Sequence, residues 1–87
     1  MVSQEFTVKN PTGIHARPAS MLVQLCSKMT DTITIVTEDN KTVNPQSILS
    51  VLMGGMSQGM KITVNVEGET EEESLRQIIE LLDSFIE

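Results

Sequence analysis

Apolar residues recur along the chain at two spacings, and these spacings predict its secondary structure. Alternation of apolar and polar residues predicts strands around Phe6 and Val8, around Ile33 and Ile35, near Val43, and most regularly across residues 61–67. Helical spacing covers residues 16–29, about 48–53, and residue 70 onward. The order strand, helix, strand, strand, helix, strand, helix predicts an α+β sandwich with the helices on one face of four strands. Periodicity alone does not separate this arrangement from other ferredoxin-like folds.

The first and last predicted helices each carry an apolar stripe that would cover a sheet. The first stripe consists of Ala19, Leu22, Val23, Cys26 and Met29, and the last consists of Leu75, Ile78, Ile79, Leu82, Phe85 and Ile86. Thr70 and Glu73 fit a capping box at the start of the last helix. Glu72 and Arg76 are expected to form an ion pair on the solvent-exposed face of this helix.

The middle helix has an ambiguous start and too many apolar residues for its length. Asn44-Pro45 and Ser47 are competing start signals, and Gly54-Gly55 ends the helix. Between and just after these signals lie Ile48, Leu49, Val51, Leu52, Met53 and Met56. A two-turn helix cannot bury all of these side chains. Leu49, Leu52 and the methionines are therefore either core residues or an exposed docking surface, and the sequence leaves both readings open.

Composition limits the kinds of protein that this chain can be. Its 87 residues fit a single small domain spanning 1–87. The net charge of −6 and the absence of Trp and Tyr disfavour nucleic-acid binding. One His and one Cys leave no soft-ligand cluster, so no metal is expected, and no motif points to a cofactor. No paired-carboxylate motif or nucleotide-binding loop indicates an independent catalytic apparatus, which suits a carrier.

The single cysteine and the N-terminus point to the cytoplasm. Cys26 cannot form an intrachain disulfide, and its place on an apolar stripe predicts a buried, inert thiol. Met-Val-Ser-Gln-Glu has no basic or apolar leader character, and nowhere do 18 apolar residues run together. We therefore expect a cytoplasmic protein with no direct membrane insertion.

The candidate chemistry lies in residues 13–19, which read Gly-Ile-His-Ala-Arg-Pro-Ala. A neutral imidazole is a nucleophile near pH 7, and His15 is the only histidine. If the helix begins at Ala16, His15 is its N-cap, and the backbone N–H groups of Ala16 and Arg17 would cradle an anion. The Arg17 guanidinium would add a bidentate clamp for phosphate oxygens. Taken alone, a histidine at a helix start is more often a solvated cap, and these residues do not identify the anion.

The heptapeptide resembles the active-site signature of the HPr family, the histidine-containing phosphocarriers of the bacterial sugar phosphotransferase system. Chain length, element order, the segment Lys41-Thr-Val-Asn-Pro-Gln-Ser47-Ile-Leu and the glycines at 54, 55 and 59 extend the resemblance over essentially the whole chain. It implies a four-stranded antiparallel sheet with three helices on one face. It also implies that Nδ1 of His15 accepts a phosphoryl group from enzyme I and passes it to sugar-specific enzyme IIA domains. The protein would then be a carrier with a transient phosphohistidine, not an enzyme.

The resemblance also assigns roles to the middle helix. It makes Ile48, Leu49, Leu52 and Met53 the expected partner interface beside the active histidine. Ser47 matches a position that HPr kinase/phosphorylase modifies in Gram-positive lineages, producing a corepressor for a catabolite control protein. Gln46 departs from the basic residue that many regulated members carry there. As a bare sequence feature, Ser47 is simply a helix cap.

Two other classes of function compete with the phosphocarrier. One is an HPr-like regulatory or nitrogen-branch paralogue that acts mainly by protein binding, although retired paralogues have replaced the histidine that this chain keeps at position 15. The other is a small-ligand sensor of ferredoxin-like shape. A monomer is expected, because a relay surface must be free for successive partners. The sugars involved and the source organism do not follow from the sequence.

Overall fold

Four strands form one antiparallel sheet in the order β1-β4-β2-β3. The computed structural model describes residues 1–86; Glu87, the last residue of the expected domain, lies outside the described residues. The strands are β1 (Val2–Thr7), β2 (Thr32–Thr37), β3 (Thr42–Val43) and β4 (Lys61–Glu67). The bounds of β4 match the predicted range, because its strict alternation leaves only one way to bury every second residue.

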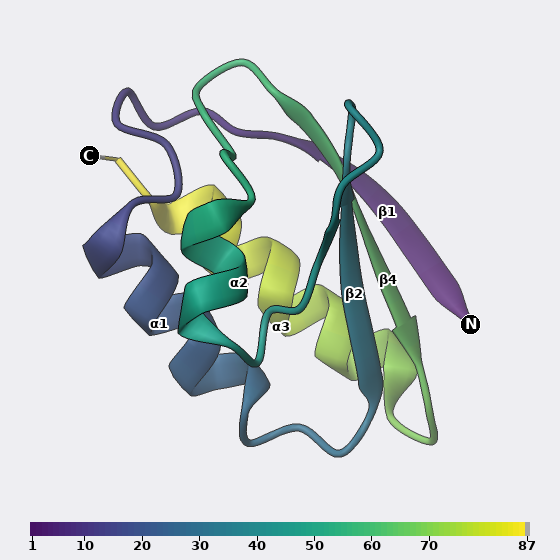
Figure 1. The fold of residues 1–87 in the computed structure, drawn as a ribbon. Coiled ribbons are helices and arrows are strands. Elements are labelled where there is room, and N and C mark those ends of the chain that lie inside the picture. Colours follow the sequence, from purple (N-terminus) through teal and green to yellow (C-terminus); the bar gives the residue numbers. More distant parts are fainter. Residues whose placement is uncertain (87) are drawn as a thin grey trace.

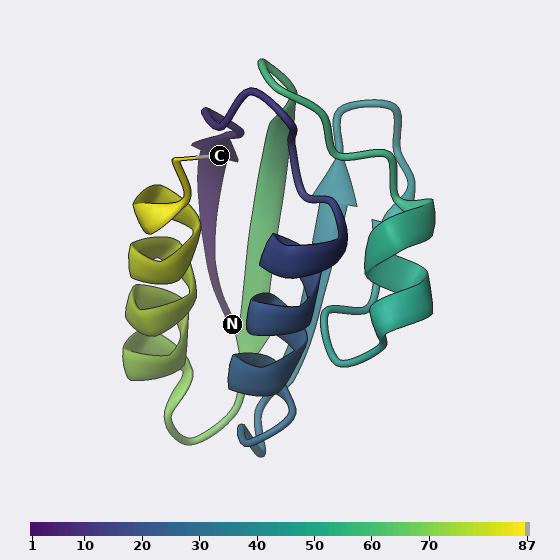
Figure 2. The ribbon, with the colours of Figure 1, turned by 90° about the vertical axis from the view of Figure 1, so that its left-hand side faces the viewer.

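Three helices cover one face of this sheet and leave the other face open (Figure 1). They are α1 (Ala16–Cys26), α2 (Ile48–Met53) and α3 (Glu71–Ser84). Viewed from the side, α1 lies between α2 and α3 (Figure 2). The predicted α+β open-faced sandwich is therefore confirmed. None of the described helices is both long and apolar enough to span a bilayer.

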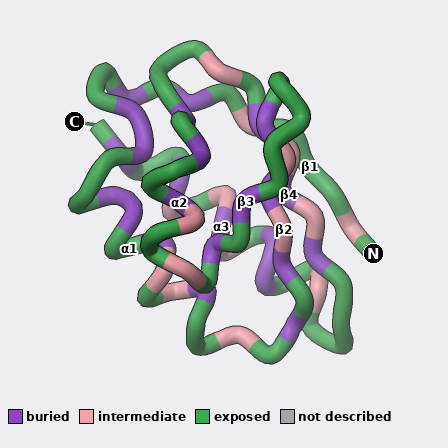
Figure 3. The backbone as a smooth tube through the Cα atoms, in the orientation of Figure 1, coloured by how far each residue is buried: buried purple, intermediate pink, exposed green. Residues whose placement is uncertain are grey.

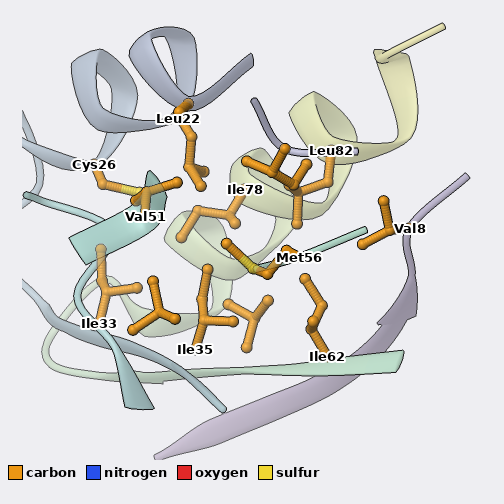
Figure 4. Close-up of a cluster of buried hydrophobic side chains, with 14 of the residues drawn as sticks. Val8, Leu22, Cys26, Ile33, Ile35, Val51, Met56, Ile62, Ile78 and Leu82 are labelled. Carbon is orange, nitrogen blue, oxygen red and sulfur yellow. The ribbon is translucent and has the colours of Figure 1, made fainter. Parts of the chain in front are cut away.

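The core fills the space between the inner face of the sheet and the helices. Register places Ile35 opposite Val64, and Ile33 opposite Val66, so the apolar side chains of the central strands form one continuous surface. Leu22 and Cys26 of α1 and Ile78 and Leu82 of α3 pack onto it (Figure 4). Along β2 and β4 the buried and less buried positions alternate, as the colouring of the backbone shows (Figure 3).

Cys26 is fully buried in this core, as predicted. Burial raises the pKa of its thiol to about 12, because desolvation disfavours the thiolate. The thiol is thus unreactive in the folded protein. Helix α1 ends at Cys26, three residues before the predicted end, and the chain continues to Met29 in turns.

The predicted capping box of α3 is wrong. Thr70 is the N-cap, but its side chain makes no capping bond. Its hydroxyl instead donates to the carboxylate of Asp31 at 2.6 Å, and the Ser74 hydroxyl donates to the same carboxylate at 2.6 Å. The Thr70 backbone N–H also donates to Asp31, at 3.3 Å. Asp31 lies in the loop before β2, so a distant carboxylate replaces the local cap.

Two other expectations for α3 are also wrong. Arg76 pairs with Glu73 and Glu80 and not with Glu72, so Glu73 is engaged there instead of in a capping box. Ile86 is exposed, because the backbone becomes extended at Phe85 and carries the next residue away from the core.

Candidate functional site

A tight turn leads from β1 to the start of α1. The Gly13 N–H donates to the Asn10 carbonyl at 3.0 Å, and the buried Asn10 side chain donates from Nδ2 to the Gly13 carbonyl at 2.5 Å. Gly13 has φ +68°, and a Cβ there would lie 2.5 Å from the Met56 carbonyl oxygen. Only glycine fits this conformation and this approach without strain.

His15 is the N-cap residue of α1, as predicted, with an extended backbone. Its carbonyl accepts from Ala19 N–H at 2.8 Å, while its side chain makes no capping bond and is exposed. The ring nitrogen Nδ1 lies 3.1 Å from the Thr12 hydroxyl and 3.2 Å from the Gly13 carbonyl oxygen. The imidazole is thus held on its Nδ1 side and accessible to solvent.

The first turn of α1 provides the anion-binding groups next to this ring. Ala16 and Arg17 are its first two residues, where backbone N–H groups have no acceptor within the helix. Pro18, in the same turn, is buried and loses no helical hydrogen bond by lacking an N–H. A shallow, open hollow is lined by Thr12, His15, Ala16, Arg17 and Ser20. An anion bound to the ring would meet the positive end of the helix dipole here.

An exposed apolar surface lies on α2. We call it the α2 patch; it consists of Ile48, Leu49, Leu52 and Met53. Leu49 is 64% exposed and Met53 is 70% exposed, whereas Val51 on the opposite side of the helix is fully buried. These exposures exclude the interpretation that the four patch residues belong to the core. Met56 is different: it is only 3% exposed and belongs to the core, so of the two interpretations that the sequence leaves open, the core one holds for this residue.

A hydrogen bond links the segment that follows α2 to the segment that precedes α1. The Ile14 N–H donates to the Met56 carbonyl at 2.8 Å, and the two helices run side by side in opposite directions (Figure 1). Met53, at the end of α2, therefore lies toward the same end of the molecule as His15. Ser47, at the start of α2, lies toward the other end of the patch.

Ser47 is the N-cap of α2, which resolves the ambiguous helix start. Its hydroxyl oxygen accepts from Ser50 N–H at 3.3 Å. Asn44 and Pro45 precede the helix, and Gln46 donates from Nε2 to the Cys26 carbonyl at 2.9 Å. Gln46 thus binds the last turn of α1, where a cation at the same position would also be favoured by the helix dipole. Ser47 is half-buried at the edge of the patch.

Two neighbours of His15 are not identified as site residues by the sequence. Thr12 reaches Nδ1 through its hydroxyl, and Asn10 reaches the carbonyl beside Nδ1. The Asn-Pro-Thr-Gly sequence signals a turn, but which atom faces the ring depends on the path of the folded loop. Within residues 1–86, no three His, Cys, Asp or Glu side chains are grouped so that they could hold a metal ion.

Comparisons with known proteins agree with this geometry. Residues 2–84 match the family model described as the PTS HPr component phosphorylation site. Over 82 residues the chain is 43% identical to a phosphocarrier protein HPr from Lysinibacillus sphaericus, covering 94% of this chain and 92% of that protein. The structure of an HPr from Thermoanaerobacter tengcongensis superposes with a TM-score of 0.90 at 39% identity, covering 97% of this chain and 93% of the other.

A second solved structure is that of Crh, a catabolite-repression protein of Bacillus subtilis, described as an intertwined, domain-swapped dimer. It is 31% identical with a TM-score of 0.76, covering 100% of this chain and 99% of that one. The family match over nearly the whole chain, the close relative and the superposed structures all lead to the same assignment. The chain belongs to the HPr family of phosphocarriers of the phosphotransferase system.

Proposed function

We propose that Nδ1 of His15 accepts a phosphoryl group from phospho-enzyme I and passes it to sugar-specific enzyme IIA domains. The observation that carries this proposal is an exposed imidazole at the N-cap of α1, directly before the amides of Ala16 and Arg17. The Nδ1 lone pair attacks phosphorus as the bond to enzyme I breaks, and the reverse displacement delivers the group to the next protein. The Arg17 guanidinium and the two amides stabilise the phosphoryl oxygens.

The α2 patch is the docking surface in this proposal. Its four apolar side chains are exposed along α2, and Met56, three residues beyond the end of this helix, accepts a hydrogen bond from the Ile14 N–H, next to His15. Burial of these side chains against a partner would stabilise the complex through the hydrophobic effect and bring the partner close to the imidazole. Enzyme I and the enzyme IIA domains would use the same patch in turn. A protein that exchanges partners in this way acts as a monomer in the cytoplasm.

Intact-mass measurement after incubation with enzyme I and phosphoenolpyruvate tests the relay. The wild-type protein should gain one acid-labile phosphoryl group and lose it on addition of an enzyme IIA domain. His15→Ala should gain none, and should keep its stability within about 1 kcal/mol because the ring makes no capping bond. Phosphorylation of His15→Ala would show that another residue is the acceptor. A wild-type protein that binds partners without being phosphorylated would instead favour the binding-only alternative.

A regulatory role for Ser47 is a separate part of the proposal. A phosphate on its hydroxyl would add a charge of about −1.5 to −2 at the edge of the α2 patch. HPr kinase/phosphorylase with ATP should modify the wild-type protein but not Ser47→Ala, and the modified form should be a poorer acceptor at His15 because enzyme I must desolvate the new anion. It should also be the form that a catabolite control protein binds. An unmodified wild-type chain, or an unchanged rate at His15 after modification, would leave Ser47 as a helix cap.

Because Crh is described as a dimer, the proposal that this protein is a monomer needs a test of its own. Light scattering coupled to size exclusion should give the mass of one chain at working concentrations. A stable dimer that relays phosphate as fast as the monomer would contradict the expectation that a free surface is required.

A further inference from the structure

Asn10 is tied to the loop before His15 by two hydrogen bonds in opposite directions. Its carbonyl accepts from Gly13 N–H at 3.0 Å, and its side-chain Nδ2 donates to the Gly13 carbonyl at 2.5 Å. The residue is only 3% exposed. A buried amide engaged in this way holds both ends of a four-residue turn at a fixed separation.

The acceptor of the Asn10 amide is also a neighbour of the proposed nucleophile. The Gly13 carbonyl oxygen lies 3.2 Å from Nδ1 of His15. To attack phosphorus, Nδ1 must carry no proton and present a lone pair. In that tautomer a carbonyl oxygen at this distance repels both the lone pair and the oxygens of an arriving phosphoryl group. A donor on the carbonyl reduces its negative potential. The Thr12 hydroxyl, 3.1 Å from Nδ1, can meanwhile donate to the ring.

We infer that Asn10 is a positioning residue for phosphoryl transfer, which acts on His15 through the Gly13 carbonyl. It holds that carbonyl in place beside Nδ1 and reduces its repulsion of the incoming phosphoryl group. The inference rests on the proposed role of His15 as the acceptor. It involves no contact between Asn10 and the phosphoryl group itself.

The experiment measures phosphorylation of Asn10→Ala with two donors. The first is enzyme I with phosphoenolpyruvate, which must dock. The second is phosphoramidate, a small donor whose P–N bond breaks as the bond to Nδ1 forms and whose nitrogen leaves as ammonia. Asn10→Ala should be slower by about tenfold at saturating enzyme I, with KM unchanged, and slower by a similar factor with phosphoramidate. The parallel loss would place the defect at the imidazole and not at the docking surface.

Two further variants separate positioning from folding. Ser74→Ala is the matched control, because it removes another buried hydrogen bond, in the first turn of α3 and away from His15. It should keep both rates even where it lowers the melting temperature. Asn10→Asp keeps the side-chain volume but places a carboxylate oxygen where the donor was, so it should transfer more slowly than Asn10→Ala. Nitrogen NMR of the ring should show a changed Nδ1 environment in both Asn10 variants and not in Ser74→Ala.

Several results would overturn the inference. Wild-type rates in Asn10→Ala with both donors would show that the amide does not act on His15. A raised KM with an unchanged saturating rate would assign Asn10 to docking, and failure of both variants to fold would assign it to folding. Phosphorylation of His15→Ala would refute the proposed function itself, which is a different outcome from wild-type behaviour in Asn10→Ala.

Discussion

Arg17 supplies the cationic side chain of the proposed site. It follows His15 by two positions and lines the same hollow. A planar guanidinium can hold two phosphoryl oxygens at once, whereas an ammonium group acts as a point charge. The distinction matters only if Arg17 orients the group during transfer.

Arg17→Lys should therefore fold normally and transfer more slowly. Loss of one charge-assisted hydrogen bond in the transition state, about 1.4 kcal/mol, corresponds to roughly a tenfold slower rate. Rapid-quench measurement of transfer from the phosphorylated protein to an enzyme IIA domain checks this. Lys28→Arg, in the turn that follows α1, is the control that leaves the site intact. Equal rates for Arg17→Lys and the wild-type protein would show that bidentate binding by the guanidinium does not contribute to transfer.

At the scale of elements, α2 combines a buried side with an exposed apolar side. Val51 points into the core and Leu49 points to solvent. In a short helix with this division, one side can be changed without disturbing the other. Substitutions on the buried side should therefore affect stability, and substitutions on the exposed side should affect partner binding.

Leu49→Glu should weaken association with enzyme I by about tenfold or more while changing the free energy of unfolding by no more than about 0.5 kcal/mol. Val51→Ala is the matched control and should do the opposite, costing about 2 kcal/mol of stability with little effect on binding by the folded protein. Titration calorimetry and urea unfolding measure the two quantities. A large stability loss in Leu49→Glu would return Leu49 to the core.

The start of α3 depends on Asp31. Hydrogen bonds from Ser74 and Thr70 hold the pKa of the Asp31 carboxyl below its ordinary value of 3.8. Because the folded pKa is below the unfolded one, the carboxylate contributes stability above the unfolded pKa, and this contribution disappears as the pH falls through the folded value.

Asp31→Asn should lower the free energy of unfolding at neutral pH, and the free energy of unfolding of this variant should depend less on pH in the acid range. The difference in unfolding free energy between wild type and Asp31→Asn should narrow as the pH is lowered from about 5 to below the ordinary carboxyl pKa. Thermal unfolding across this range, with the exposed Asp83→Asn as control, measures it. A constant difference at all pH values would show that the Asp31 charge is not involved.

The elements with strong local signals could be predicted from sequence, and the links between distant segments could not. Gly13 and Pro18 lie on either side of the start of α1, so His15 could be placed at its N-cap. The α3 cap is different: Thr70 looks like half of a capping box, and nothing local shows that Asp31 will bind its hydroxyl. Likewise Met56 follows the exposed residues of α2 in sequence, but the bond from Ile14 turns that segment into the core.

For the whole molecule, the buried thiol of Cys26 reports on unfolding. It is the only cysteine, lies in the centre of the core and has a pKa raised to about 12 by burial. Reagents that attack thiolates can reach it only when α1 separates from the sheet.

Labelling of Cys26 by a disulfide reagent should be at least about 1,000-fold slower in the native protein than in the unfolded chain, as expected for a stability near 5 kcal/mol. Its dependence on urea should have the same slope as global unfolding measured by circular dichroism. A much shallower slope would reveal a local opening of α1. Cys26→Ala provides the unlabelled control.

The polar outer face of the sheet lies opposite α1 and α2 (Figure 1). Glu5 is an exposed residue on that face, paired across β1 and β4 with Thr63. Because the native thiol is buried, Glu5→Cys would introduce the only accessible thiol. Coupling this thiol to a maleimide-coated chip would attach every molecule through the outer face of its sheet. The relay side would then point into solution in a uniform orientation. An oriented layer of this kind would capture and order partners on a biosensor without blocking the proposed phosphoryl site.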